Sequence, residues 1–198
     1  MSPTIERRAA LILALLAVSE GAWVVANFAA HPEGFARYLG LAPGHIAPLI
    51  GWLAGLLVTT VFVAACMRLP SVRSNLVRIS WLKLLALLLA VAAGILEETV
   101  FRKMLMDYLS RHGIANAGQV LLSGVAFGLA HAIWGVVGRS WRAAAGAAAA
   151  TGLLGIMLGF VYLAAGRNLG PCVAAHFLID FLAEPGLVLG AARGEIGK

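Results

Sequence analysis

Long apolar stretches, separated by short polar connections, make up most of the chain. Six of them approach the roughly 20 residues that a helix needs to cross a bilayer. The connections hold glycine, proline and charged residues, which are typical of turns. This pattern predicts an all-α, polytopic membrane helix bundle of about six transmembrane helices without a soluble domain. The predicted spans are residues 9–30, 46–67, 81–101 with a continuation as far as 109, 118–137, 144–165 and 171–190.

The composition also indicates an integral membrane protein. Hydrophobic residues make up 61% of the 198 residues and charged residues only 12%, whereas a soluble domain is about half apolar and about a quarter charged. The net charge of +6 comes largely from basic residues in the short connections, as membrane topology requires, and does not indicate nucleic-acid binding. Cys66 and Cys172 have neither metal-site nor disulfide spacing.

The distribution of Lys and Arg predicts how the chain lies in the membrane, because cytoplasmic connections carry an excess of these residues. With the N-terminus in the cytoplasm, ten of the 15 Lys and Arg residues face that side. We therefore expect a multi-pass protein of a bacterial inner membrane with both termini in the cytoplasm. The ten are Arg7, Arg8, Arg68, Arg73, Arg78, Lys83, Arg139, Arg142, Arg193 and Lys198.

Two adjacent acids, Glu97 and Glu98, interrupt the third apolar run. A charged side chain at the centre of a bilayer costs about 3 kcal/mol on insertion scales, so such residues need partners and indicate a functional site. Glu98 and Arg102 are four residues apart and share a helix face, which favours an ion pair. Glu97 is turned about 100° away and is free to face a cavity. The alternative is a helix end at the membrane surface with solvated charges, because Lys103 and Asp107 follow.

Two histidines in other apolar runs are candidate partners. His131 lies in GVAFGLAHAIWG, one turn after Phe127, and His176 lies in CVAAHFLIDF, one turn before Asp180. Taken singly, His131 is equally well explained as a hydrogen-bonded packing residue, and His176 with Asp180 as a structural pair. Three segments with acid or imidazole groups at four-residue spacing favour one shared site instead. Glu20, in the first run, is a weaker candidate for the same site.

The motifs around these residues resemble those of a known family. EETVFR at residues 97–102 matches the pattern EExxxR, FGLAH at 127–131 matches FxxxH, and HFLID at 176–180 matches HxxxN/D. In this order on successive helices they resemble the CPBP family, which comprises type II CAAX prenyl endopeptidases and bacteriocin-processing or abortive-infection-like membrane proteases. The resemblance covers about residues 80–185. Asp180 stands where the prenyl endopeptidases usually have Asn.

The resemblance implies hydrolysis of a peptide bond within the membrane. It implies that Glu97 and His131 activate a water, and that His176 and Asp180 steady the oxyanion or share a metal. The substrate would be a membrane-associated or lipid-anchored protein or peptide in the lipid bilayer: a prenylated protein, a leader peptide or a C-terminal anchor helix. The implied catalytic residues are Glu97, Glu98, Arg102, His131, His176 and Asp180.

The sequence allows two mechanisms, one with a zinc ion and one without a metal. Glu97, His131, His176 and Asp180 are a plausible zinc set, and a glutamate in a dry pocket can equally serve as a metal-free general base. In this interpretation residues 1–79 form two N-terminal transmembrane helices and residues 80–190 a catalytic four-helix core, within a single domain. The alternatives are a non-proteolytic membrane binding or immunity protein of the same fold and, less favoured, an ion-coupled transporter.

Overall fold

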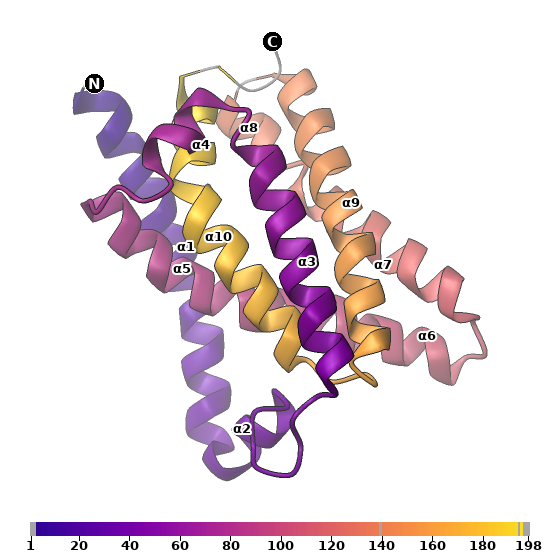
Figure 1. The fold of residues 1–198 in the computed structure, drawn as a ribbon. Helices are drawn as coiled ribbons and strands as arrows, with labels where there is room; N and C mark the ends of the chain where they lie inside the picture. Colours follow the sequence, from indigo (N-terminus) through magenta and orange to yellow (C-terminus); the bar gives the residue numbers. More distant parts are fainter. Residues whose placement is uncertain (1–2, 139, 194, 196–198) are drawn as a thin grey trace.

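The fold is a bundle of helices in a computed structural model that describes residues 3–138, 140–193 and 195 (Figure 1). Six helical segments in this part of the chain are long and apolar enough to cross a membrane, and no strand occurs there, so the predicted fold class is confirmed. The spans are α1 (Pro3–Ala30), α3 (Leu49–Cys66), α5 (Trp81–Glu98) continued by η1 (Thr99–Met106) and α6 (Asp107–Arg111), α7 (Asn116–His131) followed by α8 (Trp134–Gly138), α9 (Trp141–Ala164) and α10 (Gly170–Ala192).

The structure corrects several predicted boundaries. Two connections that the sequence predicted as turns contain short helices, α2 (Pro32–Tyr38) and α4 (Pro70–Asn75). Each begins with a proline, which suits the first helical position because an N–H there would have no partner in the helix. The first helix begins at Pro3, upstream of residue 9, so that Arg7 and Arg8 lie inside it. Charged residues at a helix end look like a connection in a hydropathy pattern, although they continue the helix.

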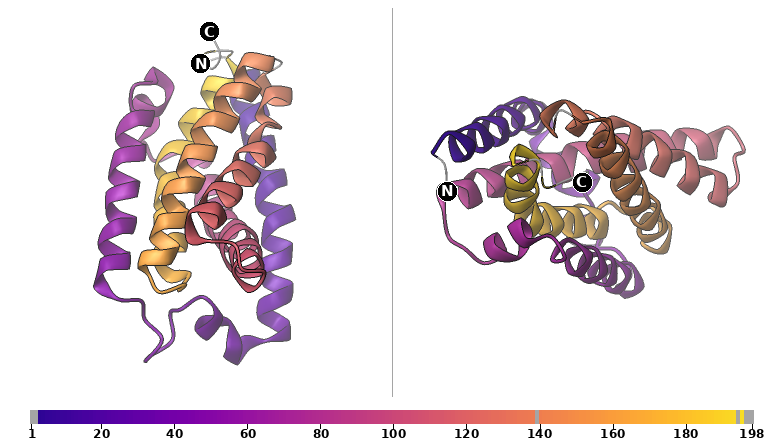
Figure 2. Two further views of the ribbon diagram at one scale, coloured as in Figure 1. Left: turned by 90° about the vertical axis from the view of Figure 1, so that its right-hand side faces the viewer. Right: turned by 90° about the horizontal axis from the view of Figure 1, so that it is seen from above.

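Helix α10 lies at the centre of the packing. It contacts α5, α3, α4 and α9 as well as α1 and α8, and the three views of Figures 1 and 2 show it enclosed by other helices along much of its length. Two clusters of buried apolar residues meet on it: Ile179 belongs to the cluster with Leu158 and Tyr162, and Leu189 to the cluster with Leu13 and Leu89. Side chains on α10 are therefore held from several sides.

Small residues bring α7 and α9 together. A Cβ atom at Gly128 of α7 would collide with the carbonyl oxygen of Ala148 in α9, and a Cβ atom at Gly155 of α9 would lie only 3.0 Å from the backbone of Gly124 in α7. Small residues at these positions therefore allow the two helices to approach closely. This close approach fixes the position of α7, whose last residue is His131.

The start of α1 and the end of α10 lie at the same end of the bundle, as an even number of spans requires (Figure 1). The cytoplasmic location of that end stays a prediction from the Lys and Arg distribution. Two residues of that prediction, Arg139 and Lys198, lie outside the described residues. Cys66 and Cys172 are both free thiols, in agreement with their spacing.

Candidate active site

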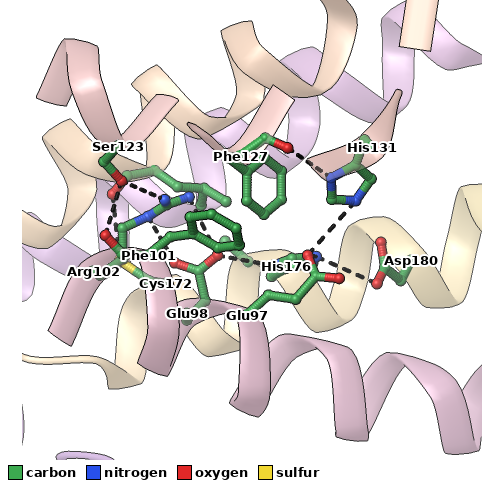
Figure 3. A network of polar contacts seen from close by, with 12 residues as sticks. Glu97, Glu98, Phe101, Arg102, Ser123, Phe127, His131, Cys172, His176 and Asp180 are labelled. Carbon is green, nitrogen blue, oxygen red and sulfur yellow. Dashed lines mark hydrogen bonds and ion pairs between the residues drawn. The ribbon is translucent and has the colours of Figure 1, made fainter. Parts of the chain in front are cut away.

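Side chains from α5, η1, α7 and α10 converge inside the bundle (Figure 3). Helix α5 ends with the two glutamates, η1 supplies the arginine, α7 ends with one histidine, and α10 carries the other histidine with the aspartate one turn later. All six residues singled out in the sequence are therefore brought together: Glu97, Glu98, Arg102, His131, His176 and Asp180.

One side of this network, built on Glu98, is closed, and its charges form short ion pairs. Glu98 is completely buried. Its Oε2 lies 3.0 Å from Nε of Arg102, and its Oε1 accepts from Nη2 of Arg102 at 3.4 Å and from Nδ1 of His176 at 2.8 Å. The predicted ion pair between Glu98 and Arg102 is present, and it offsets the cost of burying both charges. The bond to His176 joins α5 to α10, a link that the sequence did not indicate.

Ser123 of α7 completes the closed side and was missed from the sequence. Its hydroxyl accepts from Nη1 of Arg102 at 2.9 Å and donates to the carbonyl oxygen of Phe101 at 2.9 Å. The guanidinium of Arg102 also lies over the ring of Phe127, 5.2 Å from its centre. A signal for Ser123 was available, since Ser123, Phe127 and His131 follow one another at four-residue steps on one face of α7.

Directly after the two glutamates the backbone changes from an α-helix to a π-helix. The π-helical segment is η1, eight residues from Thr99 to Met106, where the sequence predicted a continuing α-helix. π-helical turns are rare and are found mostly at functional sites. The bond from Ser123 to the Phe101 carbonyl gives this segment a tertiary partner, and such a partner is not visible in the local sequence.

The other side of the network, around Glu97, is open. Oε2 of Glu97 lies 3.6 Å from Nε2 of His131 and 3.7 Å from Nε2 of His176, and Oδ2 of Asp180 lies 3.4 Å from the same Nε2 of His176. Within the part of the chain that the structure describes, no hydrogen bond reaches Oε2 of Glu97. The side chains of Glu97, His131 and Asp180 retain 17–19% of their exposure, against none for Glu98.

Hydrogen bonds fix which nitrogen of each imidazole faces Glu97. Nδ1 of His131 lies 2.9 Å from the carbonyl oxygen of Phe127, which can only accept, so Nδ1 carries the proton and Nε2 of the neutral ring is an acceptor. Nδ1 of His176 donates to Glu98 in the same way. Nε2 of His176 then faces two carboxyl groups, those of Glu97 and Asp180. A proton shared among these three groups relieves their mutual repulsion.

Two more acids surround the open side. Glu20 of α1 interacts electrostatically with Asp180 and His176. Glu184, one turn beyond Asp180 on α10, interacts with Asp180, Glu97 and Glu20. The sequence singled out Glu20 as a weaker candidate, and its place beside the site agrees with that. Glu184 was missed, although it continues the four-residue step from His176 to Asp180.

Zinc was one of the two cofactor alternatives. Among the residues that the structure describes, no group of three or more His, Cys, Asp or Glu side chains is spaced to hold a metal ion. The histidines and acids at the open side are of the chemical types that bind zinc.

Comparison with known proteins agrees with this geometry. The family model described as type II CAAX prenyl endopeptidase Rce1-like matches residues 79–182, just over half of the chain. The chain belongs to this family. The Rce1-like match contains all six site residues and confirms the resemblance seen in the motifs, while Glu20 and Glu184 lie outside it. Searches of curated proteins and of solved structures found no match.

Membership of the Rce1-like family implies an intramembrane protease of the CAAX type. Together with the six membrane-competent helices, it makes the protein an integral, multi-pass membrane protein that acts on a membrane-associated peptide substrate. The matched region includes the whole of α5, η1, α7 and α9 and the half of α10 that carries His176 and Asp180.

Proposed function

We propose that the protein is an intramembrane endopeptidase in which Glu97 is the general base. The observation that carries the proposal is the Oε2 atom of Glu97, which is buried without a hydrogen bond between the Nε2 atoms of His131 and His176. The separations of 3.6 and 3.7 Å exceed a direct hydrogen bond. A water oxygen that lies to one side of these groups, within hydrogen-bond distance of each, would bridge them.

The proposed reaction begins with a water held between Glu97 and His131. Glu97 takes a proton from this water, and the water oxygen attacks the carbonyl carbon of the scissile peptide bond. Nε2 of His131 is the acceptor end of its ring, so it can hold the second hydrogen of the water in place. When the C–N bond breaks, Glu97 returns its proton to the leaving amine, and the second product is the new carboxyl terminus.

His176 and Asp180 support the developing negative charge. A proton held by His176 lies close to the site of attack and can stabilise the oxyanion, while Asp180 keeps the ring oriented through its 3.4 Å contact. An ionised Asp180 would itself repel an oxyanion, so we assign it the orienting role. The pair of Glu98 and Arg102 positions His176 from its other nitrogen.

The proposed steps use side chains and water alone, which is the metal-free alternative. The zinc alternative is decided by elemental analysis of the purified protein and by cleavage after chelation. We expect full activity in the presence of a chelator. A loss that added zinc restores would assign the metal-dependent mechanism, with Glu97, His131, His176 and Asp180 as its ligands.

The main experiment identifies the substrate and tests Glu97 at once. Membrane proteomes are compared between cells that carry the wild type, Glu97→Gln and the control variant Lys103→Gln, whose side chain is one-third exposed and pairs with Asp107. We expect one or more precursors to accumulate with Glu97→Gln alone. The chemistry of the accumulated chain distinguishes a prenylated C-terminus from a leader peptide and from a C-terminal anchor helix.

The purified protein then tests the reaction directly. Glu97→Gln should cleave the identified precursor about 10³-fold more slowly, the upper part of the usual range for a general base, while still binding it. A Glu97→Gln variant with wild-type cleavage would overturn the assignment. Complex formation with a partner that is never cleaved would indicate a binding or immunity protein, and ion flux in liposomes would indicate a transporter.

A further inference from the structure

Lys83 is a buried cation outside the site described above. It lies in the first turn of α5 with 7% of its surface exposed. Its ammonium group donates to the carbonyl oxygens of Phe181 at 2.6 Å and Leu182 at 3.2 Å, and it lies over the ring of Phe181, 4.8 Å from the ring centre. Both carbonyls belong to the interior of α10, where carbonyl oxygens normally accept only from their own helix.

Pro185 explains why the carbonyl of Phe181 needs an outside donor. It lies inside α10, and a proline has no N–H to give to the carbonyl four residues earlier, which here is that of Phe181. Its ring also pushes that carbonyl away and bends the helix. Figure 2 shows α10 changing direction along its length. An unpaired carbonyl in a buried, lipid-embedded helix costs free energy, and the ammonium of Lys83 supplies the missing donor.

The bend separates two parts of α10 with different tasks. The part before it carries His176 and Asp180, and Asp180 immediately precedes the carbonyl that Lys83 holds. The part after it packs on α4, where a Cβ atom at Gly186 would collide with the backbone of Val72. The direction of the first part relative to α5 therefore depends on how the bend is held.

We propose that Lys83 is a positioning residue, which replaces the backbone donor removed by Pro185 and so holds the His176–Asp180 segment against α5. The two helices are then joined at two places, by Lys83 near the start of α5 and by Glu98 at its end. Lys83 touches neither Glu97 nor His131 in any contact of the described residues. Its effect on cleavage rests on the proposed function, whereas its effect on the helix does not.

A double-mutant cycle tests this, because the proposal makes Lys83 necessary only while Pro185 is present. Pro185→Ala restores a backbone N–H, so the Phe181 carbonyl regains a donor from its own helix. Lys83→Met keeps the apolar stem and removes the ammonium. We expect Lys83→Met to lower the thermal midpoint of the protein in detergent, and we expect Lys83→Met with Pro185→Ala to lie close to Pro185→Ala alone. Lys83→Arg keeps N–H donors, so its thermal midpoint should fall less than that of Lys83→Met.

Catalysis and histidine spectra give readouts beyond stability. Normalised to the folded fraction, kcat of Lys83→Met should fall about tenfold with little change in KM, as a charged hydrogen bond of ordinary strength predicts. The ring ¹⁵N signals of His176, assigned by their loss in His176→Gln, should shift in Lys83→Met. In the double variant, both kcat and the His176 signals should lie closer to those of the wild type.

Two results would overturn the proposal. The first is additivity, in which Lys83→Met causes the same loss with and without Pro185→Ala, as expected for a lysine that serves only membrane topology. The second is a His176 spectrum unchanged by Lys83→Met. If the wild type cleaves no candidate precursor, the proposed function fails, but the thermal and spectral cycle still decides the role of Lys83.

Discussion

Glu97 and Glu98 are neighbours in the chain, yet they lie in opposite environments. Glu98 is completely buried, and both of its oxygens have partners in Arg102 and His176. Glu97 keeps 19% of its side-chain exposure, and its Oε2 lies 3.6 and 3.7 Å from the imidazole nitrogens of His131 and His176. Figure 3 shows the two sides of the network, with Arg102 and Ser123 around one glutamate and His131 and Asp180 around the other.

The comparison indicates that two adjacent residues of one helix can have different roles, one structural and one catalytic. A rotation of about 100° per residue sends one acid towards the buried guanidinium of Arg102 and the other towards the imidazoles of His131 and His176. On the closed side the charges form ion pairs in the folded protein, so this side contributes rigidity. The open side leaves polar groups without partners, which lowers stability and is expected where a substrate will supply the missing contacts. His176 belongs to both sides, because each of its nitrogens faces one of them.

The largest expected effect comes from the open side. Glu97→Gln and His131→Gln should each lower kcat/KM by about 10³-fold. Because both residues would act on the same water, the double variant should be little worse than either single variant, as is usual for catalytic groups that act as a unit. Cleavage of the precursor by the purified proteins measures all three.

Multiplicative losses in the double variant would contradict this picture of a shared water. They would show that Glu97 and His131 contribute at separate steps. Thermal unfolding of the same samples provides the control, because neither single substitution removes a paired, fully buried charge. Reduced midpoints in both would assign the lost activity to unfolding.

The second prediction concerns stability, where we expect Glu98 to matter more than Glu97. Glu98→Gln leaves the buried guanidinium of Arg102 without its counter-charge, which should cost about 3 kcal/mol or more. Glu97→Gln should cost little, because the contacts of this partly exposed carboxylate with His131 and His176 are long and the amide has the same shape. Unfolding can be followed by a thiol dye that reacts with fully buried Cys172, in a Cys66→Ala background. Equal midpoints for the two variants would remove the distinction between the two sides.

The sequence predicted those parts of the site that depend on helix periodicity. The face shared by Glu98 and Arg102 and the face shared by His176 and Asp180 follow from a four-residue step, and both contacts are present. The apolar lengths likewise predicted all six spans. These features are local, so one segment of sequence contains the information that determines them.

The features that the sequence missed depend on partners far along the chain. The hydrogen bond from His176 to Glu98 joins α10 to α5, and Ser123 pairs with Arg102 across a helix contact. The π-helix η1 contains no proline or glycine, so the breakers that usually predict an irregular helix are missing. Glu184 was visible as the next four-residue step, but its charge interactions with Glu97 and Glu20 depend on the packing of three spans.

The third prediction tests whether Ser123 is part of the closed side. Ser123→Ala removes the acceptor for Arg102 and the donor for the Phe101 carbonyl, both in buried surroundings. We expect a loss of about 1–3 kcal/mol, the usual cost of buried groups left without a partner. Ser123→Thr keeps the hydroxyl and is the matched control. If alanine and threonine gave the same thermal midpoint, keeping the hydroxyl would bring no stability, and Ser123 would not belong to the closed side.

The smallest expected effect sharpens the comparison with a second pair of neighbours, Arg102 and Lys103. Both lie in η1 and both have an acid partner four residues away, Glu98 for Arg102 and Asp107 for Lys103. The side chain of Lys103 is 34% exposed and its 3.5 Å contact is accessible to solvent, so Lys103→Gln should cost less than about 0.5 kcal/mol and leave cleavage unchanged. Arg102→Gln should instead match the large loss of Glu98→Gln, since each leaves the other charge buried. Burial, rather than the presence of an ion pair, would then determine which charges in this helix the protein needs, and a substantial loss with Lys103→Gln would refute that.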